Sequence, residues 1–445
     1  MAMMNGEAMD GPEERDRTPI TAYAATMLAL CLFVGATEGY DVQAMALAAP
    51  LVKAGWGLGF NQIGALLSIS AIGLVLGSFL LSPLGDSLGR RPAILLGLFI
   101  AAIGTGTGAL APDFRWLAVT RLVAGLGLGL ALPNVLAMAM ELMPRRVHTF
   151  AVVIVSCGYP LGSALGGAFA SALVPAHGHA AVFFVGGAGT TIALLLCALF
   201  LPESPSFLAH RPGRAVELER VLARLGRRIP AESLHRKVEA IEGFRARIAA
   251  IFAPERRRLT SLLWMMNLGN VALVYFFFSW LPSLIVASGL TARDAILATS
   301  LFSASGAVGA LALAFLLPRL GPVRVLAAAY LLAIAATSAL AVGVGAGIAF
   351  YLALMVSGVV VVGSQFCLSA VVAQAYPGAI RATASGFATG IGRAGAIATP
   401  IAAGALIGLF QGSGRSFMIA LIPAAIALVA AVLLEFWGDL RRARS

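Results

Sequence analysis

Charged residues are scarce in this sequence, where Lys, Arg, Asp and Glu together make up only 11% of 445 residues. Hydrophobic residues reach 60%, and the mean hydropathy is +0.92. A soluble globular domain carries about 25% charged residues, so that class is excluded and the chain is expected to lie in a lipid bilayer.

Cysteine is scarce too, and its placement argues against a cross-linked or zinc-bound fold. The cysteines lie singly inside apolar segments, without the paired spacing of a disulfide framework or a zinc site. They are Cys31, Cys157, Cys197 and Cys367. We interpret them as small hydrophobic side chains and expect no metal site.

Enzyme motifs are missing as well. The segment 390–395 (Gly-Ile-Gly-Arg-Ala-Gly) fits the dinucleotide-binding fingerprint, but no strand precedes it and it lies inside a long apolar run. The sequence has no phosphate-binding P-loop, nucleophile elbow or metalloprotease helix. We therefore expect neither an enzyme nor a cofactor, and ATP-driven pumping and hydrolysis are disfavoured.

What the chain has in abundance is long apolar runs. A bilayer-spanning helix needs about 20 mostly apolar residues, and twelve such runs are separated by short polar loops. The runs are rich in Gly, Ala and Leu and lack the alternation of barrel strands, so helices satisfy the backbone. The predicted spans are 23–47, 62–81, 93–111, 116–139, 150–174, 181–201, 261–287, 295–317, 325–344, 348–372, 384–410 and 417–437. The sequence thus predicts an all-α membrane protein with twelve transmembrane helices.

The net charge of +11 is distributed in a way that indicates a membrane rather than a nucleic acid. Basic residues cluster in alternate inter-helix loops and in the tails, while the other loops carry scattered ones such as Lys53 and Arg115. The clusters are Arg15 and Arg17, Arg90 and Arg91, Arg145 and Arg146, Arg319 and Arg324, Arg381, and Arg441, Arg442 and Arg444. By the positive-inside rule both termini are cytoplasmic, which fits an even number of spans. No cleavable signal pattern precedes Thr18, so the first helix is expected to stay in the mature protein.

A charged segment divides the chain into two halves. Between 202 and 258 hydrophobicity falls and basic and acidic residues interleave, which predicts a cytoplasmic linker between bundles at 21–201 and 259–437. Cytoplasmic tails are predicted at 1–20 and 438–445. The halves match at one fixed offset, as parallel repeats in transporters do. The matched pairs are Gly73 with Gly306, Arg91 with Arg324, Gly125 with Gly358, Glu141 with Gln374, Pro144 with Pro377 and Gly162 with Gly395.

The loop after the second predicted span, 82–91, reads Ser-Pro-Leu-Gly-Asp-Ser-Leu-Gly-Arg-Arg, and here the chain resembles the major facilitator superfamily. Asp86 can pair with a neighbouring helix, and Gly89 permits a tight turn. Arg90 and Arg91 hold the loop on the cytoplasmic side. Such pairs can lock one conformation and break in the other, as a gate does; the alternative is a plain cytoplasmic anchor.

Further motifs, in order along nearly the whole chain, resemble the aromatic acid:proton symporters within that superfamily. The first-helix pattern acid-Gly-x-Asp is matched by 38–41. The sixth span ends in Pro-Glu-Ser-Pro at 202–205, and the seventh contains Ser-Trp-Leu-Pro at 279–282. The resemblance implies two six-helix bundles around a central site and transport by alternating access.

The activity that the resemblance implies is uptake of a small aromatic carboxylate, of the hydroxybenzoate kind, with protons across the bacterial inner membrane. The fourth span and its exit add Arg121, Glu141 and Arg145 to the candidate gating residues. A monomer is expected, with the aromatic carboxylate, protons and lipid as its partners. A symporter for another organic acid or a sugar, and a transporter-like sensor that does not translocate, are the alternatives.

Two acidic residues, Glu38 and Asp41, lie inside the first apolar run. A charge at the centre of a membrane helix costs roughly 2.5–3.5 kcal/mol, so such residues normally face a cavity and handle ions, protons or substrate. Three positions apart, they share a helix face, and desolvation and mutual repulsion raise the affinity of at least one for a proton. We predict that they couple transport to the proton gradient; the alternative is a polar helix contact at the edge of the pore.

Arg393 lies well inside the eleventh apolar run, too far from either end to snorkel easily. A guanidinium suits bidentate recognition of a carboxylate, so Arg393 is the predicted anchor for the anionic group of the substrate. The alternative is a structural pair with a buried acid such as Asp41. Arg121 lies nearer its helix end, and its role stays open between snorkelling or capping and a functional part.

A set of polar and aromatic side chains is expected near the middle of the helices, where they offer hydrogen bonds and ring surfaces to an aromatic substrate. Those predicted to bind substrate are Gln365, Asn134, Tyr159, Tyr275 and Trp280, with Asn267 and Asn270 as further candidates. The alternative for each is a contact between packed helices or an anchor at the membrane interface.

Overall fold

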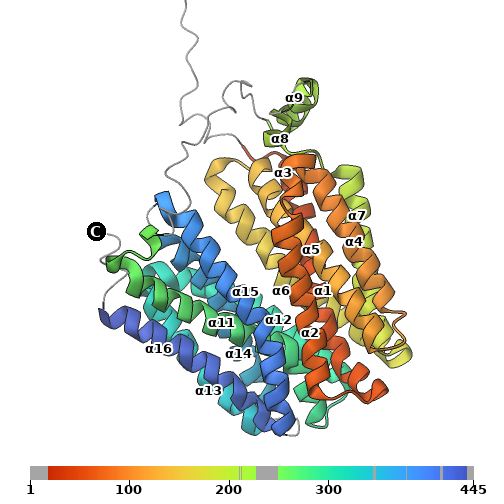
Figure 1. Ribbon diagram of the computed structural model, residues 1–445, viewed down its shortest axis with the longest axis vertical. Helices are drawn as coiled ribbons and strands as arrows, with labels where there is room; N and C mark the ends of the chain where they lie inside the picture. The colour runs from red at the N-terminus through yellow and green to blue at the C-terminus, as the bar shows by residue number, and fades with distance from the viewer. Residues whose placement is uncertain are drawn as a thin grey trace, which may run out of the picture.

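The computed structural model describes residues 19–209, 211, 213–226, 249–343, 347–376, 378–410 and 414–437 of the chain. These residues form no β-strand, and twelve of their helices are long and apolar enough to cross a membrane. The prediction of an all-α fold with twelve transmembrane helices is confirmed. The helices form two bundles that lean against each other, one red to yellow-green and the other green to blue in Figure 1.

The bundles take up the two halves of the chain in order. The first consists of α1 (Ala22–Trp56), α2 (Phe60–Leu76), α4 (Arg90–Gly108), α5 (Phe114–Leu142), α6 (His148–His177) and α7 (His179–Phe200). It also holds the π-helical turn η2 (Gly77–Leu81), the short helix α3 (Leu84–Leu88) and the 3₁₀ turn η3 (Arg145–Val147). The second consists of α11 (Pro254–Ala287), α12 (Ala292–Leu320), α13 (Pro322–Gly343), α14 (Ile348–Gln374), α15 (Gly378–Leu409), η5 (Gly414–Ala420) and α16 (Leu421–Trp437).

Two short helices, α8 (Pro205–Ala209) and α9 (Ala215–Arg224), follow the first bundle. They lie in the predicted linker, and α11 already begins inside the predicted linker range. The predicted tails and the middle of the linker fall largely outside the described residues, as do Arg15, Arg17 and the arginines after 437.

Helix ends follow ordinary capping chemistry. The Thr21 hydroxyl accepts a backbone hydrogen bond from the first turn of α1, and the Asp113 carboxylate accepts one from the N–H of Trp116 at 2.8 Å in α5. Thr291 and Asp294 form a capping box at the start of α12. These side chains satisfy backbone donors that the helix itself leaves unpaired, so polar residues fix where the spans begin.

The internal repeat is visible in the packing of the two bundles. Gly73 of α2 and Gly125 of α5 bring those two helices into backbone contact. In the second bundle, Gly306 of α12 lies against Val362 of α14, and Gly358 of α14 lies against the backbone of α12. Helices at the same place in the two halves therefore pack through glycines at matched positions, as small residues at helix contacts allow.

A methyl group at Gly125 is expected to destabilise the first bundle. An added Cβ would collide with the backbone of Ser70, which cannot move independently of α2. Overpacking of this kind costs about 1–3 kcal/mol, so Gly125→Ala should lower the Tm of the purified protein by several degrees. Gly408→Ala is the matched control, because an added Cβ there meets nothing within 4 Å. Equal Tm values for the two variants would contradict the close α2–α5 contact.

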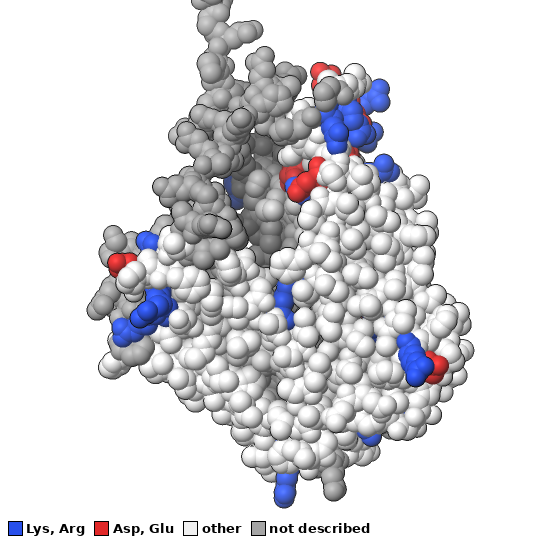
Figure 2. All heavy atoms as spheres, viewed as in Figure 1, with Lys and Arg blue, Asp and Glu red and all other residues white. Residues whose placement is uncertain are grey.

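Basic residues gather at one end of the helices, which we call the basic face; it carries α3, α8, α9 and the start of α11. Its described basic residues include Arg90, Arg91, Arg146, Arg211, Arg214, Arg220, Arg224, Arg256, Arg257, Arg258, Arg319 and Arg324. The opposite face carries Lys53, Arg115, Arg293 and Arg415. Between the two, Figure 2 shows a wide, mostly uncharged surface, as expected where lipid tails surround a protein.

The bundles contact each other through the helix pairs α1 with α11, α2 with α15, and α6 with α12. Gln43 Nε2 donates to the carbonyl of Phe278 at 2.6 Å, and Ser68 Oγ donates to the carbonyl of Ile397 at 2.8 Å. Serine hydroxyls of α6 and α12 lie 2.9 Å apart. These contacts lie at the middle of the helices or in the half that is farther from the basic face.

Toward the basic face the two bundles diverge (Figure 1). Four glycines, Gly386, Gly390, Gly404 and Gly408, share the face of α15 that is turned toward α2. An added Cβ at Gly404 would meet Phe60 and Trp280, whereas one at Gly386 or Gly390, nearer the basic face, or at Gly408, at the opposite end of α15, would meet nothing within 4 Å. Because the contacts between the bundles lie at the middle of the helices or beyond it, and the bundles diverge toward the basic face, the structure is closed at the opposite face and open toward the basic face.

Candidate functional site

Glu38 lies near the middle of α1 and is only 5% exposed. The next residue, Gly39, lets α1 pack directly against the backbone of Tyr159 on α6. The Glu38 carboxyl lies within electrostatic range of Asp41, one turn further along α1, and of Arg393 on α15. Glu38 therefore belongs to a cluster of charges to which both bundles contribute.

Asp41 is held in a separate, fully buried ion pair inside the first bundle. Arg121 Nη1 lies 3.3 Å from Asp41 Oδ1, with the two side chains 0% and 4% exposed. The Thr105 hydroxyl donates to the same oxygen, and Arg121 Nη2 donates to the carbonyl of Gly104 at 3.3 Å. The guanidinium also lies 4.7 Å from the centre of the Phe183 ring. These contacts hold one positive and one negative charge between α1, α4 and α5, away from water.

This pair settles two alternatives that the sequence leaves open. The partner of Asp41 is Arg121, not Arg393. Arg121 does not snorkel to a helix end, because its side chain is fully buried and its Nε has no hydrogen-bond partner among the described residues. The predicted gating residue Arg121 is therefore remote from the other members of that set, which lie at the basic face.

Arg393 reaches from the second bundle to the first. Its Nη1 donates to Ser78 Oγ on η2 at 3.1 Å, and the side chain is partly exposed. The π-helical turn that carries Ser78 replaces the regular end of α2, and such turns occur frequently at functional sites. Tyr275 of α11 lies within electrostatic range of both Arg393 and Glu38. The guanidinium thus lies at mid-depth, on the side of α15 that opens toward the basic face.

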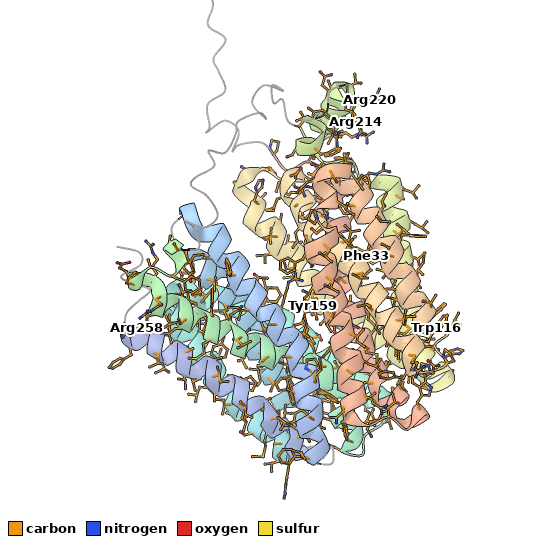
Figure 3. All side chains as sticks on the ribbon, viewed as in Figure 1. Phe33, Trp116, Tyr159, Arg214, Arg220 and Arg258 are labelled. Carbon is orange, nitrogen blue, oxygen red and sulfur yellow. The ribbon has the colours of Figure 1, made fainter. Side chains whose placement is uncertain are left out.

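Aromatic rings form one wall of the space between the bundles. The rings of Tyr159 and Phe278 meet edge to face at a centroid distance of 5.4 Å. Figure 3 shows Tyr159 where the two bundles meet. A narrow cavity adjoins the Phe278 ring and is lined by Val42, Leu67, Ser70, Ala71, Leu74, Tyr275, Phe278 and Ser279. The walls are mainly apolar and aromatic.

Of the other predicted substrate ligands, Gln365 lies on α14 with a partly exposed side chain, and its Oε1 accepts from Asn270 Nδ2 at 2.6 Å. Trp280 and Asn134 lie elsewhere. Trp280 is fully buried, and its Nε1 donates to the carbonyl of Pro400 at 3.2 Å where the bundles are closed. In this structure Trp280 packs helices together and is not among the residues that line the cavity, and its part in substrate binding stays a prediction.

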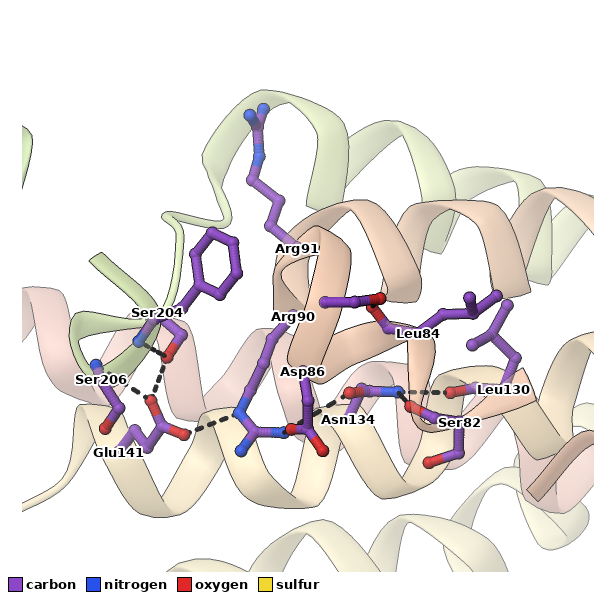
Figure 4. A network of polar contacts seen from close by, with 12 residues as sticks. Ser82, Leu84, Asp86, Arg90, Arg91, Leu130, Asn134, Glu141, Ser204 and Ser206 are labelled. Carbon is purple, nitrogen blue, oxygen red and sulfur yellow. Dashed lines mark hydrogen bonds and ion pairs between the residues drawn. The ribbon is translucent and has the colours of Figure 1, made fainter. Parts of the chain in front are cut away.

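Asn134 belongs to a polar network at the basic face (Figure 4). Its Nδ2 donates to the carbonyls of Leu130 and Ser82 at 2.9 and 3.2 Å, and its Oδ1 accepts from Arg90 at 3.5 Å. Asn134 therefore contacts the loop after α2 in this structure, and its part in substrate binding stays a prediction. Its amide fixes the loop after α2 onto α5, because α3 packs directly against it.

Arg90 is the centre of this network. Its Nε lies 2.7 Å from Glu141 Oε1, and its Nη1 lies 3.7 Å from Asp86 Oδ1. The Ser204 hydroxyl donates to the other Glu141 oxygen, and so does the N–H of Ser206, at 3.4 Å. The candidate gating residues Asp86, Arg90 and Glu141 are thus brought together, but all of these partners belong to the first bundle or to the segment 201–209 directly after it.

Gly89 and Arg91 join the same region through Glu203. Gly89 has φ +108°, a conformation that L residues rarely adopt, and an added Cβ there would collide with the Glu203 carboxylate. Glu203 Oε1 accepts from the N–H of Arg91 at 3.1 Å, at the start of α4. Arg91 Nη2 donates to the carbonyl of Ala198 at 2.7 Å. The tight turn is therefore required by the approach of a buried carboxylate.

The second bundle has a related contact at the matched position. Arg324, which the repeat pairs with Arg91, lies 2.7 Å from Glu435 on the last helix of its bundle. In both halves the arginine after the second span therefore binds the end of the last helix. The side chains of Arg145, Gln374 and Arg381, and residue Pro377, lie outside the described part of the structure.

Truncation of Glu141 is expected to destabilise the protein, and truncation of Asp86 is not. Both carboxylates approach Arg90, but the side chain of Glu141 is 15% exposed and that of Asp86 is 79% exposed. An exposed pair contributes about 0–1 kcal/mol, whereas loss of a largely buried, hydrogen-bonded partner costs more. Glu141→Ala should lower the Tm and Asp86→Ala should leave it within about a degree. A lower Tm for Asp86→Ala would contradict this division.

Sequence reasoning missed several residues of these clusters. Thr105 and Phe183 surround the Asp41–Arg121 pair, and Ser78 binds Arg393, but hydroxyl and phenyl groups are common in apolar helices and carry no signal of their own. Glu203 was recognisable only as part of the Pro-Glu-Ser-Pro motif. An acid beside a helix end after a positively charged loop could have indicated its role as a helix cap.

The chain matches the family model described as Major Facilitator Superfamily over residues 31–377. It is 33% identical to a gallate transporter of Pseudomonas putida, with 93% of this chain and 92% of that protein covered. It is 30% identical to the 4-hydroxybenzoate transporter PcaK of Pseudomonas putida, with 96% of each covered. It is 31% identical to the 3-(3-hydroxy-phenyl)propionate transporter of Escherichia coli K12, with 89% and 91% covered.

Solved structures of similar fold are also transporters. The inward open conformation of the xylose transporter XylE from E. coli superimposes with a TM-score of 0.73 at 14% identity, over 92% of this chain and 95% of that chain. A bacterial homolog to the human lysosomal transporter Spinster gives a TM-score of 0.73 at 17% identity, over 94% and 98%. At such identities the likeness shows the fold alone, which is that of a multi-pass membrane protein.

Proposed function

Because the chain belongs to the major facilitator superfamily, we propose that it is a secondary active transporter that takes up a small aromatic carboxylate together with protons. Gallate, 4-hydroxybenzoate and 3-(3-hydroxy-phenyl)propionate, after which the similar transporters are named, are all aromatic carboxylates. The observation that carries the proposal is the partly exposed guanidinium of Arg393 beside aromatic rings at the centre of the fold.

Arg393 binds the carboxylate of the substrate. A guanidinium has five N–H donors in a fixed fork, so one bond to Ser78 leaves donors for a bidentate contact. Charge-assisted bonds of this kind gain strength where the local dielectric is low. The rings of Tyr159, Tyr275 and Phe278 pack against the aromatic ring of the substrate, and Gln365 adds a polar contact from α14.

Protons enter the cycle at Glu38 and Asp41. Glu38 and a bound carboxylate are two anions beside one cation, Arg393, so a proton on Glu38 removes the repulsion between them. A proton on Asp41 breaks its ion pair with Arg121, and the guanidinium keeps the Gly104 carbonyl and the Phe183 ring as partners. Because α1 contacts both α11 and the helices of its own bundle, protonation at these acids changes the contact between bundles.

The basic face lies in the cytoplasm and both termini lie on that side, in the inner membrane of a bacterium. The structure is then the inward-facing state, with the central site open to the cytoplasm. In the outward-facing state the face of α15 that carries Gly386 and Gly390 closes against α2, since small residues allow close helix contact. The protein acts as a monomer, with residues 202–258 linking its two bundles on the cytoplasmic side.

The polar network at the basic face controls the closure of the two bundles on the cytoplasmic side. Asp86, the exposed member of the set, gains a partner on the second bundle when the bundles meet on the cytoplasmic side. Gly89, Arg90, Arg91 and Glu141 hold the loop in place for this contact. Asp86→Ala should therefore slow uptake although the Tm stays unchanged. Wild-type uptake rates in that variant would leave the loop as a plain anchor.

Uptake of labelled 4-hydroxybenzoate into cells that lack their own carrier tests the proposed function. Expression of the wild-type chain should give accumulation that an uncoupler abolishes. Excess unlabelled benzoate derivatives should compete, whereas aliphatic acids and xylose should not. Competition by a sugar or an aliphatic acid alone would indicate another class of substrate, and binding without uptake would indicate a sensor.

A further inference from the structure

An unpartnered hydroxyl lines the central cavity. The Oγ of Ser70, near the middle of α2, is buried and has no hydrogen-bond partner among the described residues. Two other serines of this segment are satisfied: Ser68 donates to the carbonyl of Ile397, and Ser78 donates to the carbonyl of Leu74. Buried polar groups are nearly always paired, so an exception in the wall of a cavity indicates a partner that arrives from outside the protein.

Ser70 is aligned with the site for the carboxylate. Ser70, Leu74 and Ser78 are spaced four residues apart and share one face of the helix that α2 and η2 form. Ser78 marks the position of the Arg393 guanidinium. At 1.5 Å per residue, Ser70 lies about 12 Å further along the helix.

The surface between these two points suits one aromatic ring. Leu74 lines it from α2, and Tyr275 lines it from α11 while lying within electrostatic range of Arg393. A benzene ring with a carboxylate at one end and a hydroxyl at the other, with a hydrogen bond of about 3 Å beyond each, has a length of the same order as the separation of Arg393 and Ser70.

We propose that Ser70 recognises a hydroxyl group on the substrate ring, at a position remote from the carboxylate. This proposal rests on the proposed function, because Arg393 must anchor the carboxylate for the ring to point toward Ser70. The ligand class is then narrower than aromatic carboxylates: it consists of hydroxylated ones. Ser70 is a specificity-determining residue, since a buried hydroxyl that finds its partner only on the substrate discriminates against the ring that lacks it.

Isothermal titration calorimetry on the purified protein tests this with 4-hydroxybenzoate, benzoate and 4-fluorobenzoate. The wild-type protein should bind 4-hydroxybenzoate at least about tenfold more tightly than the other two, as expected for one buried hydrogen bond. Ser70→Ala should reduce this preference to within about twofold, through weaker binding of 4-hydroxybenzoate and unchanged binding of benzoate. Ser283→Ala is the matched control, because its Oγ is also buried and unpartnered on α11 but does not line the cavity; it should keep the wild-type preference.

Each outcome bears on the proposed subsite, by which we mean the contact between Ser70 and the hydroxyl group of the substrate. The proposed subsite is overturned if Ser70→Ala keeps the wild-type preference for 4-hydroxybenzoate over benzoate. It is also overturned if the wild-type protein binds 4-fluorobenzoate as tightly as 4-hydroxybenzoate, and this second comparison does not depend on the folding of a variant. If the wild-type protein binds none of the three ligands, the proposed function fails and the subsite with it. Binding of all three with equal affinity overturns the subsite alone.

Discussion

Asp41→Asn is expected to abolish uphill uptake of an aromatic carboxylate. In proteoliposomes with an imposed gradient of two pH units, one coupled proton supports accumulation of roughly a hundredfold, because each unit corresponds to about 1.4 kcal/mol. Asn keeps the shape of Asp41 and an acceptor for the Thr105 hydroxyl, but it cannot take up and release a proton. The variant should therefore equilibrate labelled 4-hydroxybenzoate across the membrane without concentrating it.

The same change leaves Arg121 charged and unpaired, so coupling has to be separated from stability. Breaking a buried pair by removing one partner costs about 3–5 kcal/mol, and the Tm of Asp41→Asn should fall accordingly. In the double variant Asp41→Asn/Arg121→Gln neither charge remains. Its Tm should recover, while uphill uptake stays lost.

A matched acid-to-amide change controls for the chemistry of the substitution. Asp113 caps α5 through the N–H of Trp116, and Asn caps a helix about as well as Asp. Asp113→Asn should therefore keep both the wild-type Tm and uphill uptake. Accumulation by the double variant would show that the Asp41–Arg121 pair serves the fold and carries no coupled proton.

The architecture could be predicted from the sequence because it depends on one-dimensional properties. The length and polarity of each apolar run predict a spanning helix, and arginine placement distinguishes the two faces. The repeat offset correctly matched Gly73 with Gly306 and Gly125 with Gly358, because close contact between helices requires glycine at equivalent positions of the two halves. The central placement of Glu38 and Arg393 follows from the same reasoning, because an ionisable group in the middle of a span has few tolerable surroundings.

Partner choice could not be predicted in this way. Asp41 and Arg121 are separated by 80 positions, and their pairing depends on the angle at which α1 packs against α5. Only Arg393 was considered as a cation that pairs with Asp41, because sequence position does not show which helices are in contact. The ion pair required the three-dimensional packing of α1, α4 and α5 around Thr105.

The sequence could not predict in which direction a side chain points from its helix either. Trp280 and Asn134 were placed near the middle of their spans, but depth says nothing about which neighbour a side chain faces. Trp280 turns toward Pro400 on α15, where the bundles are closed, and Asn134 turns toward the loop after α2. Helices packed on several sides have weak polarity around their circumference, so no hydrophobic stripe distinguishes the cavity from the helix contacts.

Arg393→Ala is expected to weaken binding of 4-hydroxybenzoate at least about thirtyfold, because truncation of a charge partner that is buried and hydrogen-bonded in the complex costs about 2–5 kcal/mol. Arg393→Lys keeps the charge but loses the planar fork, so it should recover only part of the affinity. Ser78→Ala is the control: it removes the 3.1 Å contact of the guanidinium but leaves the cation, and it should change affinity by only a few fold.

Neutral analogues distinguish the anchor from a general effect on the site. The wild-type protein should prefer 4-hydroxybenzoate over its neutral amide, whose shape is nearly the same, by a factor similar to the loss in Arg393→Ala. Arg393→Ala should bind the acid and the amide about equally, because it lacks the guanidinium that distinguishes a carboxylate from a neutral amide. If Arg393→Ala still prefers the carboxylate, another cation holds the substrate, and the buried Arg121 would then have to leave Asp41 to do so.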